Sequence, residues 1–224
     1  MGWKTSTIII NKPALSDHQT LLADLGFTKL KQSEAELFEV AMYPKNGEVY
    51  IGSYQDKLII CVEELPMQII ETENSAIEEK LIQQFPDAEI CAIVLHSVVN
   101  LWGYAIIKNG QKIRARAGSS DGGTFLDTGE PLEEEKALLS KARFDENGDR
   151  VYWLDDFPDE PFQEDQVGEN FVFSVCKRYF HQELDTADEL LFETRLTGYS
   201  YGRVVQKSRS NPTQGPSKPW WKFW

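Results

Sequence analysis

The stretch LWGYAIIKNGQKIRARAG, residues 101–118, decides the fold. Its dipeptide Asn109-Gly110 stands between two runs that are rich in apolar residues. Asn-Gly supplies the two positive φ angles of a type I′ turn, and between such runs it is the strongest short-range signal for a β-hairpin. The stretch therefore predicts two antiparallel strands joined by a tight turn.

Working outward, the same kind of turn signal recurs along the chain. Asn46-Gly47 precedes EVYIGSY, Asn147-Gly148 separates KARF from RVYWLD, and Gln55-Asp56 lies between VYIGSY and KLIICVEE. A first strand is expected at Thr5–Ile10. Hairpins join antiparallel strands, whereas βαβ units join parallel ones. The repeated turns therefore predict an α+β fold with a mainly antiparallel β-sheet built from hairpins.

About three helices are expected to pack on this sheet. The first spans Ser16–Leu25, with Ser16 as its N-cap and Gly26 as its stop. The second begins at Ser75, because Glu78 stands three residues later and completes a capping box.

The third helix is expected from about Asp165 to His181, where apolar residues recur every four positions. A last strand is expected through LLFETRLTGYSY, residues 190–201. Residues 1–203 are interpreted as a single α+β domain.

The composition is that of an ordinary globular protein. The chain has 224 residues, of which 41% are hydrophobic and 26% charged, and its net charge is −13. An acidic chain repels nucleic acid phosphates and anionic lipids, so nucleic acid is excluded as a partner of the main body. No run reaches the 18 or more apolar residues of a membrane-spanning helix.

Three cysteines, Cys61, Cys91 and Cys176, are widely spaced and form no CxxC pair. This spacing argues against a disulfide framework and against a zinc site, and it fits a reducing compartment. The apolar run Ile8–Ile10 is too short for a signal peptide. We therefore expect a cytoplasmic protein. No motif predicts a cofactor or a bound metal.

One group of candidate ligand-binding residues surrounds the loop 114–131. Arg114 and Arg116 are two apart, so a strand would place both side chains on one face. They lead into a Gly-rich segment with Asp121, and two arginines beside such a loop can hold a carboxylate or a phosphate. The alternative, which we prefer, is that they pair with the acidic segment. His96 follows an apolar run and is the histidine most expected to be partly buried.

The acidic segment, residues 127–169, holds 15 acids and four bases, a net charge of 4 − 15 = −11. It is a candidate surface for a basic partner or a cation, or else a set of solvated loops. Within it, Asp145, Asn147 and Asp149 have the spacing of a calcium loop. Arg150 replaces the glycine that such a loop requires, so a hairpin turn is expected instead.

The aromatic tail, residues 204–224, differs from the rest of the chain. Residues 206–219 are polar and have linker composition. From Arg203 onward there are five bases and no acid. Tryptophan favours protein interfaces and lipid headgroups, so the tail predicts binding to another protein, self-association or contact with a membrane surface. The candidate contact residues are Trp220, Trp221, Phe223 and Trp224.

The stretch HSVVNLWGYAIIKNGQKIRARAGSSDGGTFLDTGEPLEEE, residues 96–135, resembles a group of uncharacterised bacterial proteins. They share a strand, an NG-type hairpin, an Arg-containing strand and a loop ending in a D-x-G-E-P-L run, here Asp127 to Leu132. The resemblance covers about a fifth of the chain. It implies a bacterial origin and no catalytic residue.

Three hypotheses follow, and whether the protein is an enzyme stays open. The first is a non-enzymatic, soluble bacterial interaction protein that uses the acidic surface and the aromatic tail. The second is a small-ligand binder or enzyme with its site around the 114–131 loop and His96. The third is a peripheral membrane protein attached through its tail.

Overall fold

The expected hairpin at Asn109-Gly110 is present. Both residues adopt left-handed backbone conformations, with φ of 52° and 72°. In the computed structural model, which describes residues 2–11, 17–155 and 157–202, Lys108 pairs with Gln111 across this turn. The turn therefore has the geometry that the dipeptide predicts.

This hairpin is part of a large sheet whose strand pairings are antiparallel. From one edge to the other, its strands are β2 (Lys31–Gln32), β13 (Arg195–Ser200), β4 (Glu48–Tyr54), β5 (Lys57–Val62), β1 (Lys4–Ile10), β6 (Ile90–His96), β7 (Leu101–Lys108), β8 (Gln111–Ser119) and β9 (Gly123–Gly129), with β3 (Glu36–Leu37) beside β13.

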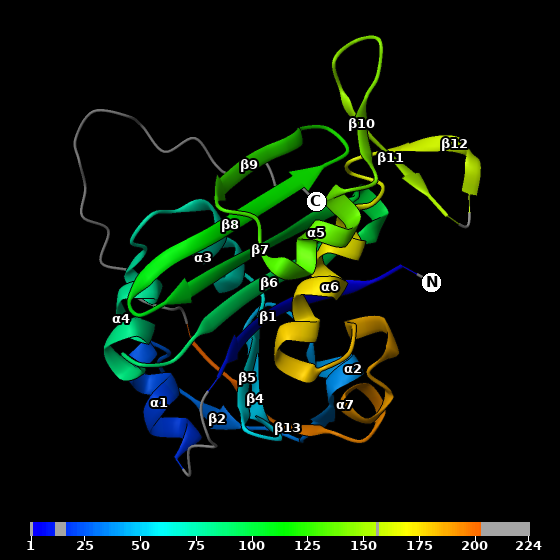
Figure 1. The fold of residues 1–224 in the computed structure, drawn as a ribbon. Coiled ribbons are helices and arrows are strands. Elements are labelled where there is room, and N and C mark those ends of the chain that lie inside the picture. Colours follow the sequence, from blue (N-terminus) through cyan, green and yellow to red (C-terminus); the bar gives the residue numbers. More distant parts are fainter. Residues whose placement is uncertain (1, 12–16, 156, 203–224) are drawn as a thin grey trace.

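The central strands are buried on both faces, which explains why they are apolar runs and do not alternate with polar residues. Alternate side chains of β1 enter two separate cores: Ile9 lies in one, and Ile8 and Ile10 in the other. Helices cover both faces of the sheet (Figure 1). One face carries α1 (His18–Leu25), α3 (Leu65–Glu71) and α4 (Ala76–Gln84); the other carries α2 (Phe38–Ala41), α5 (Glu133–Leu139), α6 (Gly168–Phe180) and α7 (Asp188–Phe192).

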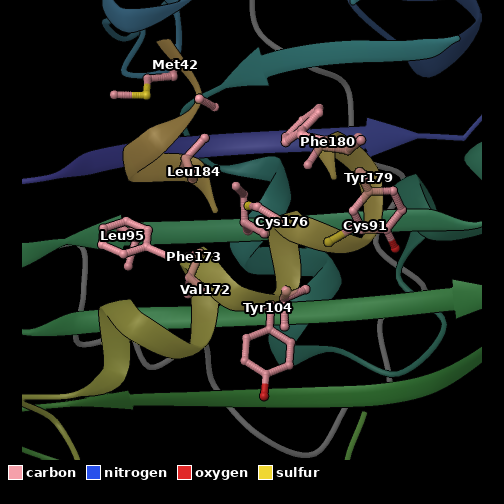
Figure 2. Packing of buried hydrophobic residues seen from close by; sticks show 14 of the residues in the cluster. Met42, Cys91, Leu95, Tyr104, Val172, Phe173, Cys176, Tyr179, Phe180 and Leu184 are labelled. Carbon is pink, nitrogen blue, oxygen red and sulfur yellow. The ribbon is translucent and has the colours of Figure 1, made fainter. Parts of the chain in front are cut away.

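The α6 helix is the main cover of its face. Figure 2 shows Val172, Phe173 and Cys176 of this helix packed toward β6 and β7, where Leu95 and Tyr104 lie. The closest approach is at Gly168, where a Cβ atom would lie 1.9 Å from the Trp102 ring. Only a glycine therefore lets the first turn of α6 sit on β7.

The α+β fold with a mainly antiparallel sheet is confirmed, and its details refine the predictions. Gln55-Asp56 joins β4 to β5, and Asn147-Gly148 lies in a hairpin between β10 (Ala142–Phe144) and β11 (Arg150–Leu154). The hairpin expected at Asn46-Gly47 is wrong. That turn leads from α2 into β4, because the residues before it form a helix and not a strand.

The expected helices are also present, with corrected ends. Asp17 caps α1, since its Oδ1 accepts from the Thr20 amide at 2.9 Å, and Ser16 lies outside the described residues. Ser75 caps α4 as predicted. The last strand is shorter than expected, because residues 188–192 form α7 and β13 begins at Arg195. The helices α2, α3, α5 and α7 were not anticipated.

A second, three-stranded sheet extends beyond the large one (Figure 1). It consists of β10, β11 and β12 (Phe157–Gln163), and we call residues 142–163 the acidic arm. At its hairpin, Asp145 Oδ1 accepts from the amides of Asn147 and Asp149, both at 2.9 Å. Asp145, Asn147 and Asp149, which have the spacing of a calcium loop, therefore form a hairpin turn, as predicted.

Two further observations bear on the sequence predictions. None of the helices in the described parts of the chain combines the length and the apolar character needed to cross a membrane. Cys61, Cys91 and Cys176 are free and buried, and burial raises the pKa of the Cys61 thiol to about 12. The four candidate residues of the aromatic tail, Trp220, Trp221, Phe223 and Trp224, lie outside the described residues.

Glu89, just before β6, fixes the far end of α6 to the sheet. Its carboxylate accepts from the guanidinium of Arg178 and from Tyr179 Oη at 3.0 Å, and Lys108 Nζ lies 3.3 Å away. Burial acts to raise the pKa of Glu89, but the hydrogen bonds and the charge of Arg178 outweigh it. The pKa of Glu89 therefore lies below its ordinary value of 4.5.

We predict that Glu89→Gln lowers the free energy of unfolding at pH 7 by about 1.5–3 kcal/mol, as expected for hydrogen bonds to a charged group. A carboxylate with a lowered folded-state pKa stabilises the fold at pH values above its unfolded-state pKa. This stabilisation is lost as the pH falls through the folded-state pKa. The difference from the parent protein should thus shrink below pH 4.5. Urea unfolding at several pH values measures it. Glu183→Gln, which removes an exposed partner of Lys177, is the control. A pH-independent difference would contradict the prediction.

Candidate functional site

Arg114 and Arg116 do lie on one face of β8, but both are buried, with exposed fractions of 2% and 0%. Glu135 in α5 binds Arg114 through two parallel hydrogen bonds, at 2.9 Å from Nε and 2.7 Å from Nη2. Arg114 Nη1 also donates to Asp127 at 2.6 Å and to the carbonyls of Thr128 and Gly129 at 3.0 Å. The Arg114 guanidinium is thus fully used by its own chain.

Arg116 lies deeper, between aromatic rings and carboxylates. Its guanidinium carbon is 4.2 Å from the centre of the Phe171 ring and 5.4 Å from that of Trp102. Its Nη2 pairs with Glu164, and its Nε lies 3.5 Å from Asp127. Stacking on aromatic faces and pairing with carboxylates are the two interactions for which a guanidinium is suited.

This buried ion-pair cluster is balanced in charge. Arg150 lies 3.5 Å from Glu164 and adds a third cation. Three arginines then face the three carboxylates of Asp127, Glu135 and Glu164, so the sum is 3 − 3 = 0. All three acids belong to the acidic segment, and the structure therefore shows the pairing that we preferred. A balanced cluster leaves no spare positive charge for a bound phosphate or carboxylate.

The cluster also changes the proton affinity of its members. Burial, followed by the charge of Glu135, raises the pKa of Tyr104 well above its usual range. Burial acts to lower the pKa of Arg114, but the hydrogen bonds that it donates to Glu135 and Asp127 outweigh this and raise the pKa. Neither Tyr104 nor Arg114 changes its charge near neutral pH. A constant charge suits a cluster with a structural role.

Asp121 and His96 lie apart from this cluster. Asp121 is exposed in the turn between β8 and β9, where the Ser119 hydroxyl accepts from the Gly122 amide at 3.2 Å. His96 ends β6 and lines a different cavity. The structure therefore does not bring the four candidate ligand-binding residues into one site.

The cavity beside His96 arises where the large sheet splits. β1 pairs with β6 as far as Lys4 and His96, but its pairing with β5 ends at Thr7 and Cys61. Beyond that point the Ser6 amide donates to the Met42 carbonyl at 2.8 Å. We call the resulting cavity, which has a volume of about 280 Å³, the His96 cleft.

The His96 cleft has a lining of apolar and polar side chains and an acidic mouth. Met67 and Tyr43 contribute to its walls, and Glu63 and Glu64 also line it. Lys4 Nζ lies 4.7 Å from the centre of the Tyr43 ring, so the mouth carries two carboxylates and one ammonium group. Such a mixture suits a partner that is aromatic and basic.

His96 supplies the polar group of the cleft. It is partly buried, and its Nδ1 has no hydrogen-bond partner among the described residues. Burial, followed by the charge of Lys4, lowers the pKa of His96, so its imidazole is neutral at pH 7. A neutral imidazole has one nitrogen that accepts a hydrogen bond. The sequence predicted partial burial of His96, but the residues that surround it had no recognisable motif.

A smaller cavity of about 150 Å³ lies beside Trp102. Four of its polar side chains are already paired: Ser97 Oγ donates to Glu169 at 2.8 Å, and Asn100 Nδ2 donates to Asp165 at 2.8 Å. Trp102 Nε1 is buried and has no hydrogen-bond partner among the described residues.

Comparison with known proteins matches a large part of the chain to a protein family. The model of a family described as a "family of unknown function (DUF6928)" matches residues 19–169. The match includes the buried ion-pair cluster and the acidic arm. No curated protein and no solved structure matches the chain.

The buried ion-pair cluster makes Glu135 the acid with the largest expected effect on stability. We predict that Glu135→Gln lowers the free energy of unfolding by about 3–5 kcal/mol, because it removes the charge that Arg114 Nε and Nη2 bind and leaves the buried cluster with one carboxylate too few. Glu133→Gln, which alters an exposed pair with Lys136 on the same helix, should cost no more than about 1 kcal/mol. Urea unfolding measures both variants. Equal losses would show that the cluster does not depend on Glu135.

Proposed function

The chain belongs to this family of unknown function, and we propose that it is a non-enzymatic interaction protein whose acidic arm binds a basic, partly apolar segment of a partner protein. The observation that carries this proposal is the composition of the surface of the arm. Phe144 and Phe157 are 72% and 59% exposed. Large exposed aromatic side chains on an extension of the fold are typical of a contact surface.

The charges around these aromatic side chains indicate the chemistry of the partner. Residues 142–163 contain seven acids and two bases, a net charge of 2 − 7 = −5. Glu146, Asp159 and Glu160 are exposed and form no ion pair with a described residue. Acids that are not neutralised within the chain steer a positively charged partner and select against a negative one.

The arm is also held in place, which lowers the entropic cost of binding. Tyr152 of β11 is completely buried, and its ring meets that of Phe171 edge to face at 5.8 Å. Tyr152 Oη donates to Glu164 at 3.1 Å, next to the buried ion-pair cluster. The base of the arm is therefore part of the core, whereas its outer part presents side chains.

The edge of the arm favours recognition through side chains. β12 carries Pro158 and Pro161, which have no amide hydrogen to offer to an added strand. At this edge the arm thus favours recognition of a partner by its cationic and apolar groups. Phe144 and Phe157 would receive the apolar groups.

The proposal includes a cytoplasmic, bacterial protein. The three buried, free thiols support a reducing compartment. The resemblance of residues 96–135 to bacterial proteins supports the source.

The test uses a synthetic lysine–leucine peptide as a defined basic and apolar probe. We expect it to bind the full chain and to shift the amide resonances of the arm. Phe144→Ala and the double reversal Asp159→Lys/Glu160→Lys should each weaken binding by about tenfold or more, the loss of a central contact.

The matched control is Glu34→Lys/Glu39→Lys, which changes the net charge equally at exposed acids outside the arm. It should leave affinity within about twofold, because distant surface charges are screened. A lysine–serine peptide tests the apolar part of the proposal. If it bound equally well, or if the control weakened binding as much as the arm variant, the arm would not be the binding surface.

A further inference from the structure

The His96 cleft has a size and a polar group that suit an inserted side chain. Its volume of about 280 Å³ is at the lower limit for a small-molecule pocket and suits an inserted side chain. Tyr43 at its rim is 48% exposed. His96 Nδ1 is buried without a partner among these residues, which costs free energy until a donor reaches it.

The aromatic tail has the complementary chemistry. Lys218 and Lys222 flank Trp220 and Trp221, and Phe223 and Trp224 follow Lys222. An indole is an apolar ring with an N–H that donates only, and one of the two nitrogens of a neutral imidazole accepts a hydrogen bond. The two lysines match the carboxylates of Glu63 and Glu64 at the mouth.

The chain leaves the described body close to this mouth. In the large sheet, Tyr199 pairs with Val49, and Val49 pairs with Val62, the residue before Glu63. Neighbouring strands are about 4.8 Å apart, so the end of β13 lies roughly 10 Å from the end of β5. Tyr201 has a raised pKa, caused by burial and then by the charges of Glu63 and Glu64. This places the exit of the tail beside the two acids.

The length of the tail is ample for this distance. From Gly202, the last described residue, to Trp220 there are 220 − 202 = 18 residues. An extended chain of that length spans up to about 60 Å, and a flexible one has a root-mean-square span of about 25 Å.

We propose that the aromatic tail of the same chain occupies the His96 cleft, with an indole between Tyr43 and Met67 and the lysines at Glu63 and Glu64. The tail is then an internal ligand that covers the exposed ring of Tyr43. This inference does not depend on the function proposed for the acidic arm.

The acidic arm is the competing site for a basic tail, and the topology favours the cleft. Arg116 and Glu164 join the base of the arm to β8, which is separated from β13 by β4, β5, β1, β6 and β7. Six strand spacings amount to about 29 Å, whereas two separate the tail exit from Glu63. The nearer site has the higher effective concentration of the tail.

The first test uses the full chain and nuclear Overhauser contacts. We expect contacts between indole protons of the tail and the methyl group of Met67, and they should persist on dilution. Replacing the four aromatic residues of the tail by serine should abolish them and shift the His96 imidazole resonances. Contacts that appear only between differently labelled copies, or contacts with Phe144, would overturn the proposal.

The second test adds a peptide of the sequence QGPSKPWWKFW, residues 214–224, to full-length variants. The chain with the four serines has an empty cleft, so it should bind the peptide about tenfold or more tightly than the unchanged chain, in which the tail competes at high effective concentration. Equal affinities would overturn the proposal, as would no binding to either chain.

Matched charge reversals locate the peptide site in the four-serine chain. Glu63→Lys, and independently Tyr43→Ala, should weaken binding of the peptide by about tenfold, the cost of losing a central contact. Asp159→Lys makes the same charge change on the arm and should leave the affinity unaltered. Urea unfolding confirms that each variant is folded. The reverse order, with Asp159→Lys harmful and Glu63→Lys neutral, would place the tail on the arm.

Discussion

Burial of Arg114 and Arg116 is the constraint on which this structure depends. An arginine stays charged in a protein, and a buried charge without a partner costs about 3–5 kcal/mol. Both guanidinium groups lie under the surface on β8, so carboxylates have to be brought to them. Asp127 arrives from β9, Glu135 from the first turn of α5, and Glu164 from the segment before α6. One electrostatic requirement thus fixes three parts of the chain.

The same requirement divides the acidic segment into two groups with different roles. Asp127, Glu135 and Glu164 are counter-ions inside the fold, and their charge is neutralised there. Glu146, Asp159 and Glu160 lie on the arm beyond the cluster and keep their charge for solvent or a partner. A net charge counted along the sequence cannot separate these groups, because the separation depends on which carboxylates reach β8. The buried base of the arm and its charged outer part therefore both result from which carboxylates reach the arginines of β8.

The sequence predicts those features whose physical cause is local. Asn109-Gly110 and Ser75 influence the backbone of residues only a few positions away. The hairpin and the helix that they predict are present. The helices α3 and α5 were not predicted because they are short and are held by elements distant in sequence, α3 by strands of the large sheet and α5 by α6. The sequence predicted that Arg114 pairs with the acidic segment but did not identify the acid, because Glu135 is 21 residues away. The His96 cleft had no signal at all, because it results from the separation of two strands that are far apart in sequence.

That separation can exist because the backbone groups at the split find other partners. Where β1 leaves β5, the Ser6 amide bonds to Met42, and the Ser6 hydroxyl donates toward the carbonyls of Val62 and Glu63 at 2.8 and 2.7 Å. The sheet therefore opens without leaving these groups unpaired, and the cleft needs no ligand to be stable. His96 Nδ1 is the exception within it. In the arginine cluster the charges are balanced within the chain, so an anionic ligand would have to displace a carboxylate that already binds an arginine. The His96 cleft is a cavity of about 280 Å³, so a side chain can enter it without displacing one of these ion pairs. This difference is why we propose a structural role for the arginines and an inserted side chain for the cleft.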